Sequence, residues 1–250
     1  MKLLYFTATG NCLYIAKRLG GELISIPQAV RAGNYEFTDD KIGLVFPIFW
    51  LTVPLNVEEF LRKAKLNSNY VFAVLTYGML DGIAAKNLAK IGEECSIRFS
   101  YINTIKMVDN YLPGFAMEKQ MEAEPQKQIE QHLNAIIADV NNSREMAPKA
   151  SVFGKIMAGM MEKNVSIGGG VAKDYVVEDA CNHCGTCETV CPLNNVKVQD
   201  SKPVFGNRCV SCLACTQNCP QNAIRVKNEK SRVRFRNAHI SLKEIADANR

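Results

Sequence analysis

The sequence predicts an α/β protein, in which a five-stranded parallel sheet with helices on both faces is followed by a small cysteine-rich α+β unit. Two observations support this prediction. Short, continuously apolar segments alternate with helical patterns over about the first 140 residues, as expected when helices cover both faces of a sheet. Eight of the ten cysteines then lie between Cys181 and Cys219, in a second unit of different composition.

The first strand and helix are the clearest elements. Residues 2–6 form an apolar run that ends at the sequence Thr7-Ala8-Thr9-Gly10-Asn11, which predicts a buried strand followed by a turn. Apolar residues at helical spacing then predict a helix over residues 11–19, and the pair Gly20-Gly21 ends it.

The remaining elements follow in alternation. Apolar runs predict strands at residues 23–26, 42–46, 70–75 and 96–107. Helical patterns predict helices within residues 53–64, near residues 83–91 and over residues 119–140. Right-handed crossovers leave few topologies for five such strands, and the flavodoxin-like arrangement fits them. In that arrangement ligands bind beyond the carboxyl ends of the strands.

The chain divides into four regions. Residues 1–150 form the α/β unit, and residues 151–173 contain an amphipathic helix (151–164) and a glycine-rich linker (166–170). Residues 174–230 form the cysteine-rich unit, and residues 231–250 form a basic C-terminal extension. In that extension Arg232, Arg234 and Arg236 alternate with apolar residues. This pattern predicts a strand with one basic face, which is either solvated or a docking surface for an acidic electron-transfer partner.

The cysteine-rich unit contains an internal repeat at an offset of 28 residues, from Cys181 to Cys209. Each copy reads Cys-x2-Cys-x2-Cys-x3-Cys-Pro, in which three cysteines bind one [4Fe–4S] cluster and the fourth binds the other cluster. Structural zinc, the alternative, favours two cysteine pairs separated by a longer loop. We therefore predict cluster I on Cys181, Cys184, Cys187 and Cys219, and cluster II on Cys209, Cys212, Cys215 and Cys191. Residues 174–226 resemble a bacterial two-[4Fe–4S] ferredoxin.

The turn after the first strand is a candidate phosphate site. It opens a helix, so backbone N–H groups and the positive helix end face one point, where Thr7 and Thr9 add hydroxyls and Gly10 permits close approach. The sequences of a triphosphate loop and of a Rossmann site are both missing from it. It resembles the flavodoxin loop that binds the 5′-phosphate of FMN, with Asn11 in the loop and with Cys12 where that family usually has a hydroxyl residue. Cys12 has an alternative interpretation as a redox-active thiol whose pKa is lowered at the helix N-terminus.

Two further segments at strand ends are candidates for the flavin ring. Phe49 and Trp50 follow the third strand, and Tyr77 and Gly78 follow the fourth. Aromatic faces can stack on an isoalloxazine, and glycine backbone can approach its edge. The alternative is that Phe49 and Trp50 are core residues. Tyr77 and Asp81 are the nearest candidates for delivering a proton to the flavin.

Together these motifs resemble the flavodoxin-like/ferredoxin fusion proteins of the ferrodoxin type over most of the chain. The resemblance implies FMN in residues 1–150 and two [4Fe–4S] clusters in residues 174–230, with electrons passing between them and an external redox protein or small-molecule acceptor. No residue is then needed as a catalytic acid or nucleophile. Two other functions remain open: a flavin-dependent reductase of a small substrate fed by the clusters, and a flavin-free carrier or redox sensor. The linker permits a homodimer in which electrons cross between chains.

Composition limits the partners further. The formal net charge is +5, and residues 225–250 carry eight basic and three acidic residues, so the tail alone accounts for the excess. We therefore expect this positive charge to balance the negative charge of anionic cofactors rather than to bind a nucleic acid. The longest apolar run, residues 42–55, contains two prolines and is shorter than the ~20 residues of a membrane span. The N-terminal apolar stretch is too short for a signal peptide, so we expect a cytoplasmic protein.

Overall fold

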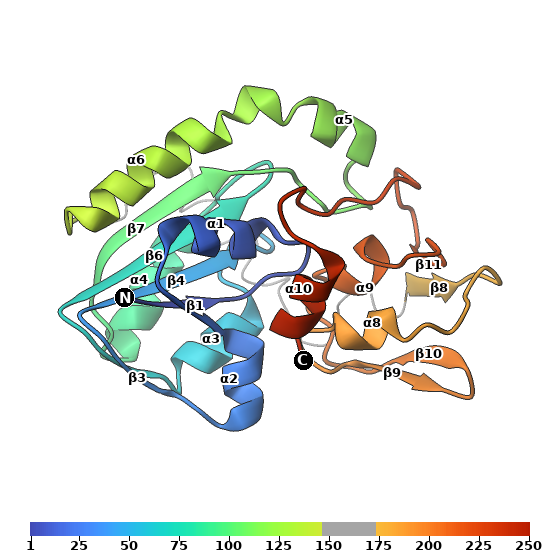
Figure 1. Ribbon diagram of the computed structural model, residues 1–250, viewed down its shortest axis with the longest axis horizontal. Coiled ribbons are helices and arrows are strands. Elements are labelled where there is room, and N and C mark those ends of the chain that lie inside the picture. Colours follow the sequence, from blue (N-terminus) through green and yellow to red (C-terminus); the bar gives the residue numbers. More distant parts are fainter. Residues whose placement is uncertain (147–173) are drawn as a thin grey trace.

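The computed structural model describes residues 1–146 and 174–250 and has the predicted α/β architecture. The parallel sheet and its helices lie on one side of the molecule, and the cysteine-rich unit lies on the other (Figure 1). The C-terminal helix α10 (Leu242–Ala248) lies between the two parts in this view.

The central sheet has five strands in the order β2-β1-β4-β6-β7, and every neighbouring pair is parallel. Counted among these strands alone the order is 2-1-3-4-5, which is the flavodoxin-like order. The strands are β1 (Lys2–Tyr5), β2 (Glu22–Ser25), β4 (Lys41–Pro47), β6 (Tyr70–Tyr77) and β7 (Phe99–Lys106). The predicted fold class is therefore confirmed.

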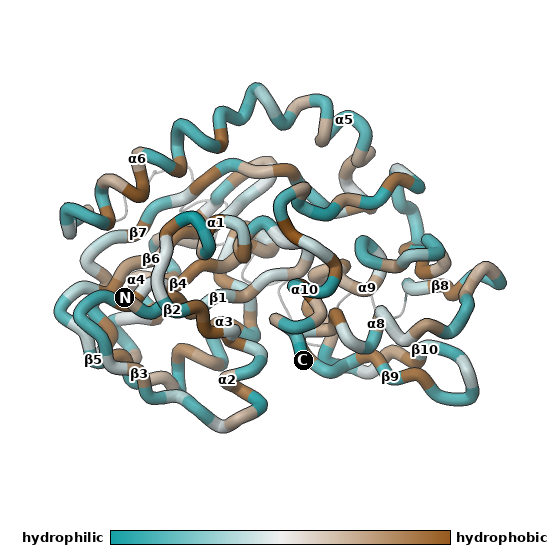
Figure 2. The backbone as a smooth tube through the Cα atoms, in the orientation of Figure 1, coloured by the Kyte–Doolittle hydropathy of each residue, from teal (hydrophilic) through white to brown (hydrophobic). Residues whose placement is uncertain are grey.

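Helices cover both faces of this sheet. Along β4, Ile42 and Leu44 pack into one core and Val45 into the other, because side chains alternate between the faces of a strand. Helices α1 and α6 cover the face of Val45, and α2, α3 and α4 cover the opposite face. Figure 2 shows the apolar strands between helices with polar outer turns. The helices are α1 (Asn11–Leu19), α2 (Ile26–Ala32), α3 (Leu55–Leu61), α4 (Ala84–Glu94) and α6 (Ile129–Asn141).

Several elements differ from the prediction. The single helix expected over residues 119–140 is wrong, because the segment forms α5 (Met117–Glu122), a 3-10 turn η1 (Pro125–Lys127) and α6. Pro125 lacks an N–H for a continuous helix, and Gln128 has a φ of 49°. Helix α2 was not predicted; it begins at the cap residue Ser25, whose hydroxyl accepts from the N–H of Gln28. The short parallel pair β3 (Glu36–Thr38) and β5 (Lys65–Asn67) was also not predicted.

The cysteine-rich unit repeats in structure as it does in sequence. Its two short helices, α8 (Thr186–Thr189) and α9 (Ala214–Gln217), lie at corresponding positions of the two cysteine runs. Its strands form two antiparallel pairs, β8 (Tyr175–Val177) with β11 (Ile224–Val226), and β9 (Val196–Gln199) with β10 (Lys202–Phe205). Each copy of the repeat therefore consists of a strand, a cysteine loop with a helix, and a second strand.

The predicted basic strand over residues 232–236 is wrong, since this segment has no strand structure. The side chain of Arg234 is only 8% exposed and pairs with Glu229, so it is not part of a solvated face. Phe235 is buried as well, and its N–H donates to the side chain of Gln217 at 2.8 Å. Arg232 and Arg236 are exposed, so only part of the expected basic face is solvated, and the backbone N–H of Phe235 has a side-chain acceptor instead of a neighbouring strand.

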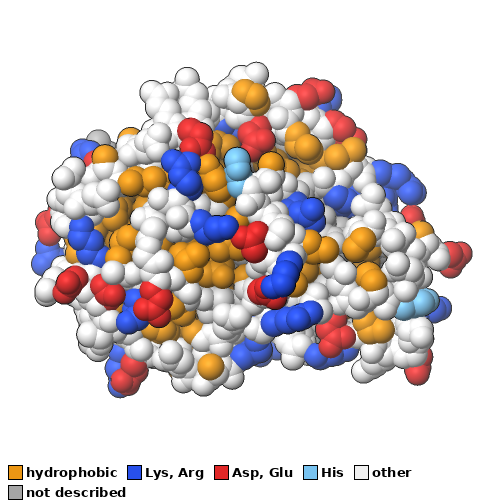
Figure 3. Space-filling view, viewed as in Figure 1, with side chains coloured by type: hydrophobic (Ala, Val, Ile, Leu, Met, Phe, Trp, Pro, Cys, Tyr) orange, Lys and Arg blue, Asp and Glu red, His pale blue; other side chains and the backbone are white. Residues whose placement is uncertain are grey.

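Part of the prediction concerns residues outside the described ranges. The amphipathic helix at 151–164 and the glycine-rich linker at 166–170 both lie there. Among residues 1–146 and 174–250, no helix has the length and apolar character needed to cross a membrane. On the face shown in Figure 3, basic and acidic side chains are interspersed.

Gly43, in the middle of β4, gives a first prediction. An alanine Cβ there would lie 2.3 Å from Cζ of Phe72 and 2.6 Å from Cδ2 of Leu3. We expect Gly43→Ala to cost about 1–3 kcal/mol of stability through overpacking, and thermal unfolding followed by circular dichroism measures it as about 2–4 °C in Tm for each kcal/mol. In the Gly43→Ala/Phe72→Leu variant the two losses should be less than additive; full additivity would contradict this packing account.

Candidate functional site

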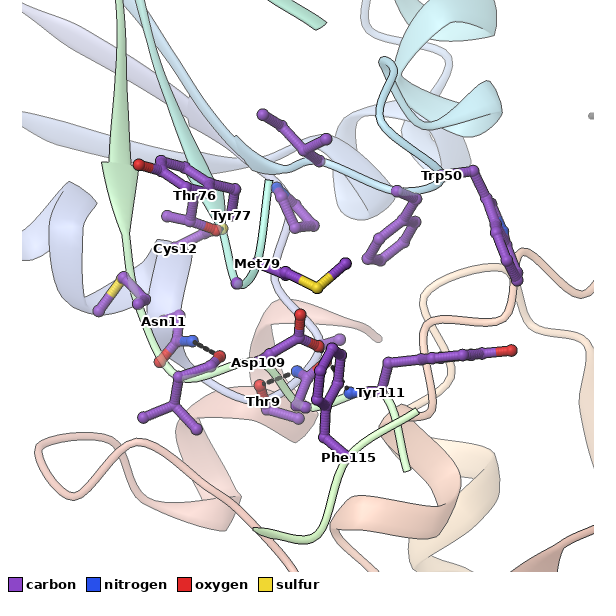
Figure 4. Close-up of a pocket in the computed structure, with 18 of the residues that line it drawn as sticks. Thr9, Asn11, Cys12, Trp50, Thr76, Tyr77, Met79, Asp109, Tyr111 and Phe115 are labelled. Carbon is purple, nitrogen blue, oxygen red and sulfur yellow. Dashed lines mark hydrogen bonds between the residues drawn. The ribbon is translucent and has the colours of Figure 1, made fainter. Parts of the chain in front are cut away.

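A cavity of about 410 Å³ opens at the carboxyl ends of the sheet strands (Figure 4). Its walls come from the loops after β1, β4, β6 and β7, where a flavodoxin-like sheet binds ligands. A volume of this size suits a ligand such as a cofactor.

Eight of the nine residues predicted for the flavin site line this cavity. They are Thr7, Thr9, Asn11, Cys12, Phe49, Trp50, Tyr77 and Gly78. The ninth, Gly10, faces away from it, since a Cβ on Gly10 would lie 3.0 Å from Cβ of both Asn237 and Ile240. Gly10 has a φ of 99°, so it allows the turn and the close contact with the C-terminal segment rather than a wall of the cavity.

The loop between β1 and α1 is held by its own hydroxyls. The N–H of Gly10 donates to Oγ1 of Thr7 at 3.2 Å, and Nδ2 of Asn110 donates to Oγ1 of Thr9 at 2.6 Å. In both bonds the threonine oxygen accepts, so each hydroxyl keeps its O–H for a further acceptor. Two hydroxyl donors at a helix N-terminus form a site suited to an anion.

Cys12 is buried in this loop, with its Sγ 3.2 Å from Oγ1 of Thr76. Burial raises the pKa of Cys12 to about 12. This shift is opposite in direction to the one in the alternative interpretation, a reactive thiol whose pKa is lowered at the helix N-terminus. The residue is a neutral thiol in the wall of the cavity.

The loop after β4 places an aromatic side chain at the rim. Trp50 is 48% exposed and meets Tyr111 edge-on at a centroid distance of 5.4 Å, so the alternative of a core role for Trp50 is wrong. Its φ of 52° lies in the left-handed region. Two backbone hydrogen bonds between Phe49 and Thr52, at 3.2 and 3.0 Å, close the turn that holds this conformation.

The segment after β7 adds Asp109, which was not predicted as a site residue. Asp109 lines the cavity, and its carboxylate accepts from the N–H of Tyr111 at 3.1 Å. A Cβ on Gly78 would lie 2.1 Å from Oδ2 of Asp109, so only glycine allows these two loops to meet. Burial raises the pKa of Asp109. Asp81, by contrast, is not among the lining residues, and its carboxylate accepts from Oγ1 of Thr104 at 3.2 Å.

The eight clustered cysteines form two groups in space. Burial raises the pKa of Cys187 to about 11, and its sulfur neighbours Cys219, Cys184 and Cys181 add to the rise. Burial raises the pKa of Cys215 to about 12, with Cys191 and Cys209 adding to it. The same causes act on Cys212, whose sulfur neighbours are Cys191, Cys209 and Cys215. The sulfur neighbours that act on each of these thiols thus come from its own run and from the fourth cysteine of the other run.

Backbone N–H groups point at the two exchanged cysteines in the same way. The N–H of Asn195 donates to Sγ of Cys191 at 3.2 Å, and the N–H of Ala223 donates to Sγ of Cys219 at 3.3 Å. In the described parts of the chain, no three His, Cys, Asp or Glu side chains surround a point where one metal ion would bind. A [4Fe–4S] cluster makes a different demand, because each thiolate binds a different iron.

The second cysteine run adjoins the cavity. Ser211, between Cys209 and Cys212, is one of the residues that line it. Cys212 packs against both hydrophobic cores of the sheet, and Leu213 packs with Val108 in the loop after β7. Cys184, in the other group, is exposed. One group of cysteines therefore lies next to the cavity, and the other reaches the surface.

Comparison with known proteins agrees with part of this picture. Residues 174–197, which include the first cysteine run, match the family model described as a 4Fe-4S binding domain. Among curated proteins, none matches the chain significantly. A putative flavoprotein from Bacteroides uniformis is similar over 48% of this chain and 94% of its own, with 17% identity and a TM-score of 0.32. The Trp repressor binding protein from Bacillus subtilis is similar over 42% and 83%, with 10% identity and a TM-score of 0.30. The chain therefore combines an α/β unit with a five-stranded parallel sheet and a segment, residues 174–197, that matches the model of a 4Fe-4S binding domain.

Proposed function

We propose that this protein transfers electrons between FMN, held by residues 1–150, and two [4Fe–4S] clusters, held by residues 174–230, and on to an external redox partner. One observation carries the proposal. The loop with Cys209 and Cys212, two ligands of proposed cluster II, contributes Ser211 to the wall of the cavity proposed for FMN. Electron carriers in one chain need such proximity, and no acid, base or nucleophile is required.

The cavity fits FMN in its donors as well as its size. The loop of residues 7–12 offers two hydroxyls and a helix N-terminus to the phosphate, while Trp50, Tyr77 and Tyr111 offer aromatic faces to the ring. The half-buried carboxylate of Asp109 accepts a hydrogen bond within the loop after β7 and packs against Gly78 of the loop after β6, so it forms the wall between them. FMN bound here would exchange two electrons with its surroundings, and each cluster would exchange one.

The cysteine groups fit two clusters. A buried thiol with a raised pKa loses its proton when a bound metal supplies compensating positive charge. Cys187 and Cys215 would therefore be thiolates only when the clusters are bound. The N–H donors of Asn195 and Ala223 suit cluster sulfur ligands, because such hydrogen bonds set the reduction potential. Cluster II would then receive electrons beside the cavity, and cluster I would pass them out near exposed Cys184.

The mouth of the cavity favours a second candidate, a flavin-dependent reductase of a small organic substrate. Its rim carries Trp50, Met79 and Leu80, which are 48%, 57% and 51% exposed. Apolar side chains at this exposure suit an organic molecule that approaches the flavin. Turnover with candidate substrates separates this reductase from the carrier.

Cofactor analysis of anaerobically purified protein tests the proposal. We expect about eight irons, about eight acid-labile sulfides and about one FMN for each chain. Cys95→Ala is the matched control, since Cys95 lies outside both cysteine groups and should keep this content. Absence of extractable flavin would refute the flavin part, and zinc in place of iron would refute the cluster part.

A further inference from the structure

Three consecutive carbonyl groups of the proposed phosphate loop accept hydrogen bonds from the C-terminal part of the chain. The carbonyl of Thr7 accepts from Nδ2 of Asn249 at 3.1 Å, and the carbonyl of Ala8 accepts from Nδ2 of Asn218 at 3.0 Å. The carbonyl of Thr9 accepts from the N–H of Asn237 at 2.9 Å. The three asparagines are buried, at 3–4% exposure.

These bonds determine which way the loop faces. A loop presents its N–H groups to an anion only when its carbonyls point elsewhere, and buried carbonyls need donors. Here the donors for Thr7 and Ala8 lie 242 and 210 residues further along the chain. The α/β unit therefore does not supply these partners of its own phosphate loop.

The same two side-chain amides also hold the backbone beside the exchanged cysteines. Nδ2 of Asn249 donates at 3.2 Å to the carbonyl of Val190, the residue before Cys191. Asn218 itself precedes Cys219, and its Nδ2 donates at 2.9 Å to the carbonyl of Ala214. Each amide thus joins the phosphate loop to the segment of a cysteine that would complete a cluster.

The Oδ1 atoms of these two asparagines have no hydrogen-bond partner among the described residues. In each side chain, therefore, only the amide nitrogen is hydrogen-bonded, and it donates to two carbonyl groups. A buried amide with an unpaired oxygen costs stability, so the two donor bonds are what the fold gains from asparagine at these positions.

We propose that Asn218 and Asn249 are positioning residues that couple the iron–sulfur sites to FMN affinity. When the cysteine runs are folded around their clusters, Val190 and Asn218 are fixed, and the amides hold the carbonyls of Thr7 and Ala8 away from the phosphate. The coupling is reciprocal, so bound FMN also stabilises the clusters. This proposal rests on the proposed function, because it assumes FMN in the cavity.

Flavin binding to the cluster-loaded protein tests the proposal. FMN and riboflavin are titrated by fluorescence quenching into the flavin-depleted wild type and the Asn218→Ala/Asn249→Ala variant. We expect about 10–100-fold weaker FMN binding in the variant, because the two hydrogen bonds that orient the carbonyls of Thr7 and Ala8 are lost together with those to Val190 and Ala214. Riboflavin, which has no phosphate, should show a much smaller change. Asn56→Ala is the control. Asn56 is also a buried asparagine whose Oδ1 has no hydrogen-bond partner among the described residues, but it lies in α3 and does not line the cavity, so FMN affinity should be kept.

A second measurement reports the reciprocal effect. Saturating FMN should increase the fraction of iron that the wild type retains against a competing chelator, and this protection should be largely lost in the double variant. If the double variant loses iron on purification, Asn218→Ala and Asn249→Ala are compared singly, each with about 3–10-fold weaker FMN binding.

The outcomes separate the two proposals. Tight FMN binding and full protection in the asparagine variants would overturn the coupling alone. A wild type that binds neither FMN nor riboflavin would overturn the proposed function and the coupling with it. Equal losses of FMN and riboflavin affinity would show that the asparagines support the whole cavity rather than the phosphate loop, which also contradicts the proposal.

Discussion

The variant Cys191→Ala/Cys209→Ala should lose about four of about eight irons, no more than either single substitution, because both residues are assigned to cluster II. The variant Cys191→Ala/Cys181→Ala should lose nearly all of its iron, because it damages both clusters. The reason is spatial: the sulfur neighbours of Cys212 and Cys215 include Cys191 from the other run. Iron and labile-sulfide analysis of anaerobic protein measures both variants.

Uncrossed binding, with each run holding its own cluster, predicts the reverse. Cys191→Ala/Cys181→Ala would then keep about four irons, and Cys191→Ala/Cys209→Ala would keep none. Either of these results contradicts the crossed assignment. Cys95→Ala is again the control, and Cys12→Ala extends it to the cavity wall, because neither cysteine belongs to the clustered groups.

The second large effect concerns the phosphate loop. Replacing Thr9 by aspartate should weaken FMN binding about 100-fold or more, because a carboxylate beside a bound phosphate costs several kcal/mol. The fold should tolerate the change, since an aspartate oxygen can still accept from Nδ2 of Asn110, as Oγ1 of Thr9 does. Fluorescence quenching by the flavin-depleted protein measures the affinity.

Riboflavin serves as the internal control for this variant. It lacks the phosphate, so Thr9→Asp should change its affinity only slightly. Thr9→Val, which removes the hydroxyl without adding charge, should weaken FMN binding by about tenfold at most. An unchanged FMN affinity in Thr9→Asp would show that the phosphate does not bind at this loop.

The sequence predicted the sheet well because its strands are buried on both faces. Such strands appear as uninterrupted apolar runs, and the β4 and β6 runs were located to within two residues at each end. The break within residues 119–140 and the helix α2 were missed, because each depends on a local feature that periodicity does not register. These features are Pro125 with the left-handed Gln128 in one case and the cap residue Ser25 in the other.

The sequence predicted those parts of the candidate site that short local motifs form. Residues in the loops after β1, β4 and β6 were predicted, because a parallel sheet brings the carboxyl ends of its strands together. Ser211, Asn218 and Asn249 could not be assigned to it from sequence, since their roles depend on contacts across about 200 residues of chain. Asp109 had a weaker signal, its place after the fifth strand.

The basic tail is a second case in which contacts between residues far apart in the sequence decide the role of a side chain. Arg234 is buried beside Glu229, and the charge of Cys219 acts on it. Arg31 donates at 3.4 Å to the carbonyl of Pro192, and the charge of Cys191 acts on it. Each exchanged cysteine therefore has one arginine in its neighbourhood, Arg234 from the tail and Arg31 from α2. Positive charge at these positions would stabilise the reduced form of each proposed cluster and raise its potential. Arg234 thus fits the counter-charge interpretation of the tail, although the predicted strand is not formed.

Flash photoreduction of the bound flavin tests the central claim most directly. After a flash in the presence of a sacrificial donor, the iron–sulfur absorbance should bleach in a first-order process whose rate does not depend on protein concentration. The process should persist in Cys181→Ala/Cys184→Ala, which keeps cluster II, and vanish in Cys191→Ala/Cys209→Ala, which lacks it. Bleaching that scales with protein concentration, or that survives without cluster II, would contradict electron transfer from the flavin to the adjacent cluster within one chain.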